Sequence, residues 1–297
     1  MSNNNLESPQ TSTSSDASSV SPPLLMSKSP VTRHSLTRIV KAQIILLASN
    51  LTEANYSTIC VEIITLIDTY GAVIRRHLIR FLLVDIFKKD ANSSGKQTNN
   101  TPLLYLLLKD IVITTGSNTN TLGSTVNPSS DDKNHSNNNQ QQLELPFVTF
   151  AETLCCFCKS DSAPLVVDLE YLYTKLGLDA FQRFALSSLL LLSLSFENQQ
   201  NQQQHISDQA KALASRDFKH VIDYQQQQLH PNNNTTFDEK VITWCIDSIK
   251  KSVTAGFGLF NYQDIQLFAA VLPKYCNDKS ICKRIQQQLS IDPNMAE

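Results

Sequence analysis

The chain has 297 residues, a formal net charge of −2 and 41% hydrophobic residues. This length accommodates one or two domains with a core of their own, and the near-zero charge supplies no broad field to attract nucleic acid or an acidic membrane. With only 7 glycines, the composition argues against folds that need many tight turns or phosphate-binding loops, and it favours helices.

The first helical pattern follows a low-complexity N-terminus. Residues 1–30 are rich in Ser, Asn and Pro, and we expect them to be disordered. The next stretch, RIVKAQIILLASNL (38–51), is dominated by aliphatic residues. It predicts a buried helix whose inward side chains are Ile39, Ile44, Leu46, Leu47 and Leu51.

Residues 55–87 predict two helices joined by a glycine. Apolar residues between Tyr56 and Tyr70 are spaced three and four apart, with Asn55 as the expected N-cap and Gly71 as the expected helix end. The second helix leads to Lys88 and Lys89, whose charges suit a helix C-terminus. Together they predict an αα-hairpin.

The same rhythm recurs further along the chain. Pro102 opens a short helix, PLLYLLLKDIVI, and the motif GLD divides VVDLEYLYTKLGLDAFQRFALSSLLLLSL into two helices. A helix is expected over 207–228, and a Gly-rich break separates two more between 239 and 275. Polar inserts lie between these blocks, at 88–101, 115–142, 197–206 and 229–236. Long loops cost little stability, because closure entropy grows only with the logarithm of length.

The blocks together predict an all-α fold of stacked antiparallel helical hairpins, a HEAT-like α-solenoid over residues 31–290 with disordered loops. Tails at 1–30 and 291–297 flank it. No fixed sequence period is visible, so the solenoid is inferred from the repeated hairpins alone. Several separate small domains are the alternative, but no single block could bury enough apolar surface by itself.

The 7 cysteines are an odd number, and several lie within apolar periodic segments. No secretory signal opens the sequence, and no apolar run reaches the roughly 18 residues of a membrane span. We therefore expect reduced thiols, in the cytoplasm and nucleus, and no membrane contact. The cluster LCCFCK, with Cys155, Cys156 and Cys158, lacks the separated ligand pairs of a zinc site, so core cysteines are the favoured interpretation.

Catalytic signatures are missing from the sequence. The motif GFG at 256–258 is too short for a dinucleotide-binding fingerprint and precedes no βαβ pattern. No Ser, His and Asp set lies in a recognisable nucleophile context. We expect a protein that is not an enzyme and that uses no cofactor and no metal.

Three arginines, Arg75, Arg76 and Arg80, form the candidate partner-binding surface. On a helix Arg76 and Arg80 lie about 40° apart, whereas Arg75 lies about 100° to the side of Arg76. An RNA-binding face would also need interleaved aromatic side chains, but Phe81 and Phe87 are predicted to point to the core. The simplest interpretation is a solvated face with ion pairs to Glu62 and Asp68 of the preceding helix. Contact with a protein partner and contact with nucleic acid remain alternatives.

The pattern NLT--NY-----EI---I---G----RHL-R-L between residues 50 and 82 resembles the N-terminus of the large scaffold subunit of the CCR4–NOT deadenylase complex. The matching residues are Asn50, Leu51, Thr52, Asn55, Tyr56, Glu62, Ile63, Ile67, Gly71, Arg76, His77, Leu78, Arg80 and Leu82. IVKAQIILLASNL is similar to that family's first helix, and NSSGK at 92–96 to its following loop. VVDLEYLYTKLGLDAFQRFALSSLLLL and QDIQLFAAVLPKYC are similar to later helical segments. The resemblance covers most of residues 36–289, closely in the first 50 and loosely beyond.

The resemblance implies a HEAT-like arm without catalytic residues that docks other protein subunits of a CCR4–NOT-like complex. The activity of such a complex is mRNA deadenylation, which leads to mRNA decay and translational repression. The expected function is thus a non-enzymatic scaffold segment, with an RNA-binding helical-repeat protein as the alternative. Direct nucleic-acid binding is not the expectation from the near-neutral charge.

Overall fold

The computed structural model describes residues 33–92, 101–113, 146–160, 167–194, 201–223, 239–254, 258–276 and 278–289. All regular elements within these residues are helical, which confirms the predicted all-α class. Short 3₁₀ turns, η1 (Glu53–Asn55) and η2 (Leu272–Lys274), accompany the α-helices. The α-helices are α1 (Arg33–Ser49), α2 (Tyr56–Tyr70), α3 (Ala72–Asn92), α4 (Thr101–Ile113), α5 (Pro146–Cys158), α6 (Leu169–Leu176), α7 (Ala180–Ser193), α8 (Asn201–Asp223), α9 (Glu239–Thr254), α10 (Tyr262–Val271) and α11 (Lys279–Leu289).

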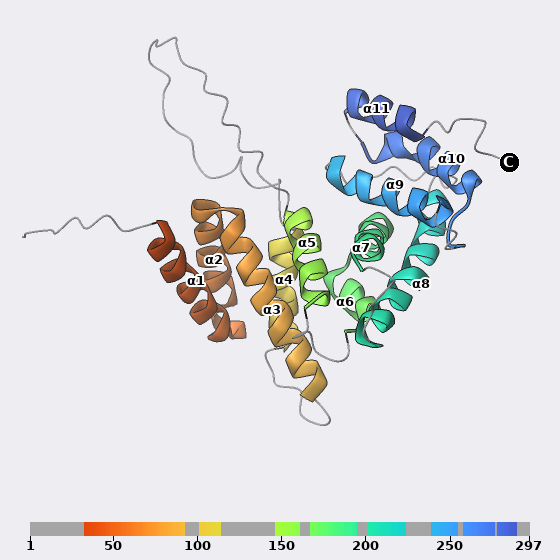
Figure 1. The fold of residues 1–297 in the computed structure, drawn as a ribbon. Coiled ribbons are helices and arrows are strands. Elements are labelled where there is room, and N and C mark those ends of the chain that lie inside the picture. Colours follow the sequence, from red (N-terminus) through yellow and green to blue (C-terminus); the bar gives the residue numbers. More distant parts are fainter. Residues whose placement is uncertain are drawn as a thin grey trace, which may run out of the picture.

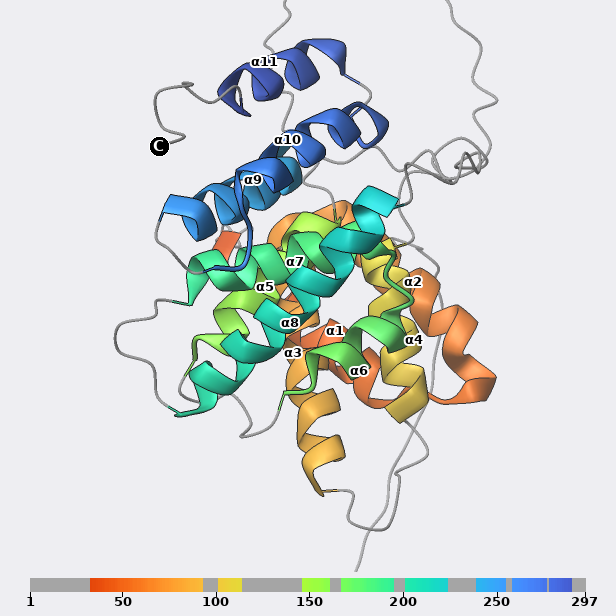
Figure 2. The same ribbon diagram turned by 90° about the vertical axis from the view of Figure 1, so that its right-hand side faces the viewer.

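The helices follow one another through space in roughly their chain order. Figure 1 shows α1 and α2 at one end and α10 and α11 at the other, with α3 to α8 between them. The main packing partners of each helix are the helices one or two positions away in that order, such as α1 with α3, α3 with α5, and α7 with both α8 and α9. In the view of Figure 2, which is turned by 90°, α9, α10 and α11 lie together at the top.

The hairpin of α2 and α3 is built as the sequence predicts, with one difference at its start. Gly71 ends α2 at a φ of 81°, a backbone conformation that residues with a Cβ rarely adopt. Asn55 precedes α2, but its side chain caps the 3₁₀ turn instead of the helix: Oδ1 accepts from the Thr52 amide at 2.7 Å, and Nδ2 donates to the Asn50 carbonyl at 3.0 Å. Tyr56 donates to Asp110 of α4 at 2.5 Å, which ties this hairpin to the next helix.

The prediction that α1 is buried is wrong for one of its faces. Ile44 and Leu51 are 1% exposed, but Ile39 is 60% and Leu46 62% exposed. The helix is aliphatic on nearly every side, so periodicity did not reveal which face lacks a neighbour. Because α1 lies at the end of the succession, only one side of it packs against α2 and α3.

Two of the expected polar inserts are shorter than predicted. Helix α3 continues to Asn92, five residues into the insert at 88–101, and α8 begins at Asn201, inside the insert at 197–206. Lysine and glutamine are good helix formers, so polar residues extend both helices. Ile206 is fully buried and anchors the start of α8. The inserts at 115–142 and 229–236 and the tails at 1–30 and 291–297 lie outside the described residues.

One continuous cluster of buried side chains runs from Val40 in α1 to Ile285 in α11. Its C-terminal part is an aromatic group whose ring centroids lie 4.2–6.5 Å apart, close to the roughly 4.5–7 Å of favourable ring packing. The members of this group, drawn from α7, α8, α10 and the segments next to α10, are Phe181, Phe184, Phe218, Phe260, Phe268 and Tyr275. The described helices therefore share one core.

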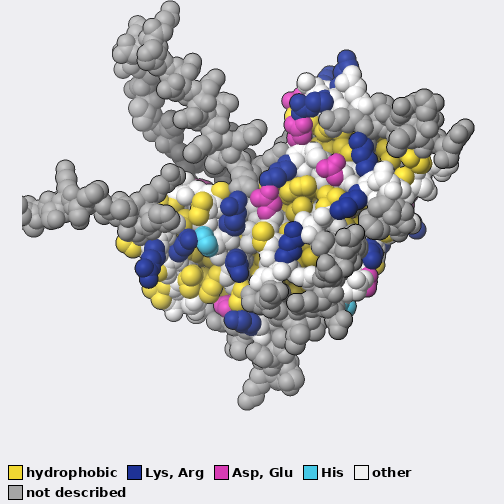
Figure 3. All heavy atoms as spheres, in the orientation of Figure 1, with side chains coloured by type: hydrophobic (Ala, Val, Ile, Leu, Met, Phe, Trp, Pro, Cys, Tyr) yellow, Lys and Arg dark blue, Asp and Glu magenta, His cyan; other side chains and the backbone are white. Residues whose placement is uncertain are grey.

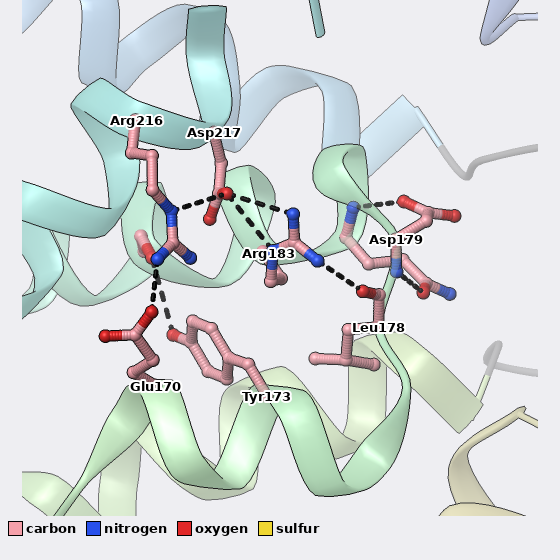
Figure 4. A network of polar contacts seen from close by, with 9 residues as sticks. Glu170, Tyr173, Leu178, Asp179, Arg183, Arg216 and Asp217 are labelled. Carbon is pink, nitrogen blue, oxygen red and sulfur yellow. Dashed lines mark hydrogen bonds and ion pairs between the residues drawn. The ribbon is translucent and has the colours of Figure 1, made fainter. Parts of the chain in front are cut away.

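A buried ion pair joins α7 to α8. The side chain of Asp217 is fully buried, and its Oδ1 accepts from Nε of Arg183 at 3.1 Å and from Nε of Arg216 at 3.3 Å (Figure 4). Arg183 also donates from Nη1 to the Leu178 carbonyl at 2.8 Å, just before α7 begins. Arg216 reaches across to Glu170 of α6. The network thus fixes the relative positions of α6, α7 and α8.

Candidate protein-docking surface

The three candidate arginines divide between two sides of α3. Arg75 lies 4.0 Å from Asp68 of α2, the ion pair expected with the preceding helix, and its side chain is only 12% exposed. Arg76 and Arg80 are exposed on another side of α3. The helical geometry therefore separates Arg75 from the other two, and only Arg76 and Arg80 belong to one open surface.

A basic cluster gathers around His77 on this open surface. Lys41 of α1 and Arg76 and Arg80 of α3 lie close enough to act on the imidazole: burial, then Lys41, Arg80 and Arg76, lower the pKa of His77. We call Lys41, Arg76, His77 and Arg80 the basic cluster. Lys41 and Arg80 form no ion pair with any described residue. The positive charge of Lys41 and Arg80 is therefore not neutralised by any residue that the structure describes.

One acidic residue limits the basic cluster on the side of α5. Oε2 of Glu152 lies 3.9 Å from Nη2 of Arg76, and its other oxygen contacts Nζ of Lys240 on α9. Glu239, next to Lys240, pairs in turn with Arg284 of α11. In Figure 3, basic and acidic side chains alternate over this face towards α11. Arg76, Lys240 and Arg284 thus each have an acidic partner on this face, whereas Lys41 and Arg80 have none among the described residues.

Exposed hydrophobic side chains lie on the same two helices. Val73 of α3 is 50% exposed and lies within about 20° of Arg80 around the helix. Ile39 and Leu46 of α1 are 60% and 62% exposed, but they lie about 140–160° around the helix from Lys41 and so face another side. Figure 3 shows hydrophobic side chains between the lysines and arginines on this part of the surface. A surface that combines an exposed aliphatic group with Lys41 and Arg80, which form no ion pair with any described residue, is suited to a protein partner that offers apolar and acidic side chains.

The geometry gives little support to a single-stranded nucleic acid ligand. Such ligands need aromatic side chains on which the bases stack, placed among the cations. The two aromatic residues of α3, Phe81 and Phe87, pack against the core, and Phe87 is only 3% exposed. The sequence-based prediction that both rings point inward therefore agrees with their positions.

Two residues of this surface could not be predicted from the arginine pattern. Lys41 and Glu152 come from α1 and α5, and only the packing of both helices against α3 brings them to Arg76 and Arg80. His77 was visible in the sequence between the two arginines, but its place among three cations depends on Lys41. The sequence therefore identified only those residues of the basic cluster that lie on α3.

The cysteines lie mainly in the core. All are free thiols and all are buried except Cys156, which is exposed on α5. Within the described ranges, no group of three or more His, Cys, Asp or Glu side chains has the geometry to hold a metal ion. None of the described helices is both long and apolar enough to cross a membrane.

Comparison with known proteins adds no identification. No protein family, no curated protein and no solved structure matches the chain.

Proposed function

We propose that the chain is a non-enzymatic scaffold segment whose basic cluster docks a protein partner. The partner we propose is another subunit of a CCR4–NOT-like complex, which places the function in mRNA deadenylation, mRNA decay and translational repression, in the cytoplasm and nucleus. The site of docking is the surface of α1 and α3 around Lys41, His77 and Arg80.

The observation that carries this proposal is the positive charge of Lys41 and Arg80 on a surface that also exposes Val73. Lys41 and Arg80 have no acidic partner among the described residues, although the chain as a whole carries a net charge of −2. With no described carboxylate to pair with, these two cations can pair across an interface. Val73 adds apolar area on the side of α3 that carries Arg80.

The residues behind the family resemblance point to the same surface. Many of them have a role in the fold: Asn55 caps a turn, Gly71 has a positive φ, and side chains such as Ile63, Leu78 and Leu82 are at most 1% exposed. Arg76, His77 and Arg80 are exposed and make no comparable contribution to the core. Among the resembling residues of α3, they are the ones that a partner would require.

We propose further that the helices form a HEAT-like solenoid. The packing of each helix mainly on its neighbours one and two positions away is what stacked hairpins produce. The gradual progression from α1 to α11 in Figure 1 supports this arrangement. A solenoid presents long continuous surfaces, which suits a scaffold that holds several subunits.

The test compares three forms of the tagged full chain: the wild type, a Lys41→Glu/Arg80→Glu variant, and a Lys219→Glu/Lys283→Glu control with the same change in charge. Each is purified from cells, and the bound proteins are identified by mass spectrometry. The wild type and the control are expected to retain deadenylase-complex subunits. The Lys41→Glu/Arg80→Glu variant should lose them while its circular dichroism spectrum stays helical.

RNA binding provides the contrary outcome. If Arg76, Arg80 and Lys41 contacted three phosphates of a single strand, the affinity would fall with salt at a log–log slope of about −2, from roughly 0.7 per phosphate. Tight binding of a single-stranded RNA with this slope, lost in the Lys41→Glu/Arg80→Glu variant, would overturn the scaffold proposal in favour of an RNA-binding helical-repeat protein.

A further inference from the structure

A second surface feature lies in the C-terminal half of the chain, away from the basic cluster. A small cavity of about 40 Å³, partly open to solvent, lies between α7, α8, α9 and the segment before α10. Its walls are Leu191, Leu192, Lys211, Ser248, Lys251, Ser252 and Leu259. At roughly 10–15 Å³ for each water-sized group, this volume holds about three such groups, which is the size of one small aliphatic side chain.

The cavity is apolar on one side and cationic on the other. Leu191 is 6% exposed and Leu192 and Leu259 are half-buried, so these three side chains supply its apolar wall. Both ionisable residues that line it, Lys211 and Lys251, are basic. Asp208, on the same helix and outside the cavity wall, lies 3.3 Å from Lys211 and pairs with it. Lys251 forms no ion pair with any described residue.

Hydrogen bonds of Ser252 fix one wall of the cavity in place. Its Oγ accepts from the backbone amides of Leu259 at 3.2 Å and Phe260 at 3.1 Å. The Phe260 ring packs into the aromatic group of α7, α8 and α10. Leu259 is thus held between two anchored positions, and the apolar wall exists before any ligand arrives. Such preorganisation reduces the free-energy cost of binding.

We propose that this cavity binds an acidic segment of a partner protein, with an aliphatic side chain against the three leucines and an adjacent carboxylate on Lys211 and Lys251. The carboxylate is that of an acidic side chain next to the aliphatic residue in the partner's segment. Lysines suit this role, since each acts as a mobile point charge and does not demand planar, two-pronged geometry. The proposal concerns a different surface from the basic cluster, so the failure of either leaves the other standing.

The test uses small probes that isolate each part of the proposed ligand. N-acetyl-leucine carries both the aliphatic group and the carboxylate, N-acetyl-leucinamide lacks the charge, and N-acetyl-glycine lacks the side chain. Each is titrated into the full chain while the methyl signals of Leu191, Leu192 and Leu259 are followed by NMR. N-acetyl-leucine is expected to shift these signals at millimolar concentration and to bind at least about tenfold more tightly than the amide, with N-acetyl-glycine giving no saturable shift.

Two variants separate specific charge recognition from a general effect of charge. Lys211→Gln/Lys251→Gln should abolish the preference for the acid over the amide. Lys219→Gln/Lys283→Gln removes the same charge from exposed positions that do not line the cavity, and it should preserve that preference. Equal binding of acid and amide by the wild type would overturn the proposal. Fatty acids provide a second contrary outcome. If octanoate bound more tightly than N-acetyl-leucine, and if affinity rose with every methylene added to the fatty acid, the site would be a pocket for acyl chains and the proposal would be overturned.

Discussion

Arg183 and Asp217 form a salt bridge in which one partner is fully buried and the other is 25% exposed. Two nitrogens of the guanidinium, Nε and Nη2, each lie 3.1 Å from the same carboxylate oxygen. The other oxygen of Asp217 is buried and accepts no hydrogen bond from the described residues. The Arg183 side chain is therefore the main compensation for a carboxylate that has left water, which leads to the first prediction.

Replacing Arg183 by Gln is expected to destabilise the protein by about 2–3 kcal/mol, because it leaves a buried carboxylate with only a partly exposed arginine beside it. Arg216→Gln is the matched control. It also removes a contact with Asp217, but Arg216 is 41% exposed, so the expected loss is below about 1 kcal/mol. Urea unfolding followed by circular dichroism measures both. Equal losses would show that burial does not decide the energy of this network.

The two positive-φ glycines at helix ends provide a second prediction. Gly71 has φ 81° and ψ −167°, which residues with a Cβ hardly populate, whereas Gly177 has φ 63° and ψ 35°, in the left-handed well that they can enter. A Cβ at Gly71 would meet nothing within 4 Å, and one at Gly177 would make only ordinary contacts. Gly71→Ala should cost about 2–3 kcal/mol and Gly177→Ala about 1 kcal/mol, from backbone strain alone. Thermal unfolding of both variants tests the order, and a larger loss for Gly177→Ala would contradict it.

The basic cluster predicts the titration of His77. Burial lowers its pKa, and Lys41, Arg80 and Arg76 lower it further. The unfolded chain therefore binds a proton at this histidine at higher pH than the folded chain does. The contribution of His77 to stability falls as the pH drops through the ordinary histidine value towards the folded one.

NMR titration of the His77 ring protons measures this effect directly. Lys41→Gln should raise the pKa part of the way to its ordinary value, since burial is the larger cause and remains. Added salt should act in the same direction by screening the three cations. A pKa unchanged by both treatments would show that the cations lie too far from the imidazole to form a cluster.

Thiol reactivity supplies the fourth prediction. Cys156 is exposed, whereas the other six cysteines are buried. Burial also raises the pKa of Cys155, Cys158 and Cys245, which reduces their thiolate fraction. In the folded protein, a thiol reagent such as DTNB should modify one cysteine quickly and the rest slowly. Cys156→Ser should remove the fast phase, and a second fast thiol would show that a buried helix opens.

The sequence predicted those parts of the fold that depend on local chemistry. Gly71 and the break at Gly177 were recognisable because only glycine adopts their backbone angles easily, and the hairpins on either side followed from apolar spacing. The exposure of Ile39 and Leu46 was not predictable, since an aliphatic helix shows no difference between a face that packs and a face that does not. The start of α8 was misplaced because a run of Gln and Asn is equally compatible with a loop and a first helical turn.

The candidate surfaces were predictable only in part, for a related reason. Arg76 and Arg80 share one helix, so their common face followed from helical geometry. Lys41 and Glu152 reach them from helices distant in the sequence, and no pattern within 297 residues specifies that encounter without knowledge of the packing. The leucine and lysine cavity was missed entirely because its walls come from three helices and a connecting segment.

The packing of each helix on its near neighbours in chain order has a consequence for synthesis. Most helices that emerge from the ribosome find a packing partner among the one or two helices made just before them, so they can dock without waiting for distant sequence. The hairpin of α2 and α3 would already have α1 to pack against, and α7 would meet α5 before α8 and α9 are complete. The nascent chain can therefore acquire its core progressively from the α1 end, with the unpartnered side of the most recent helix covered by the next.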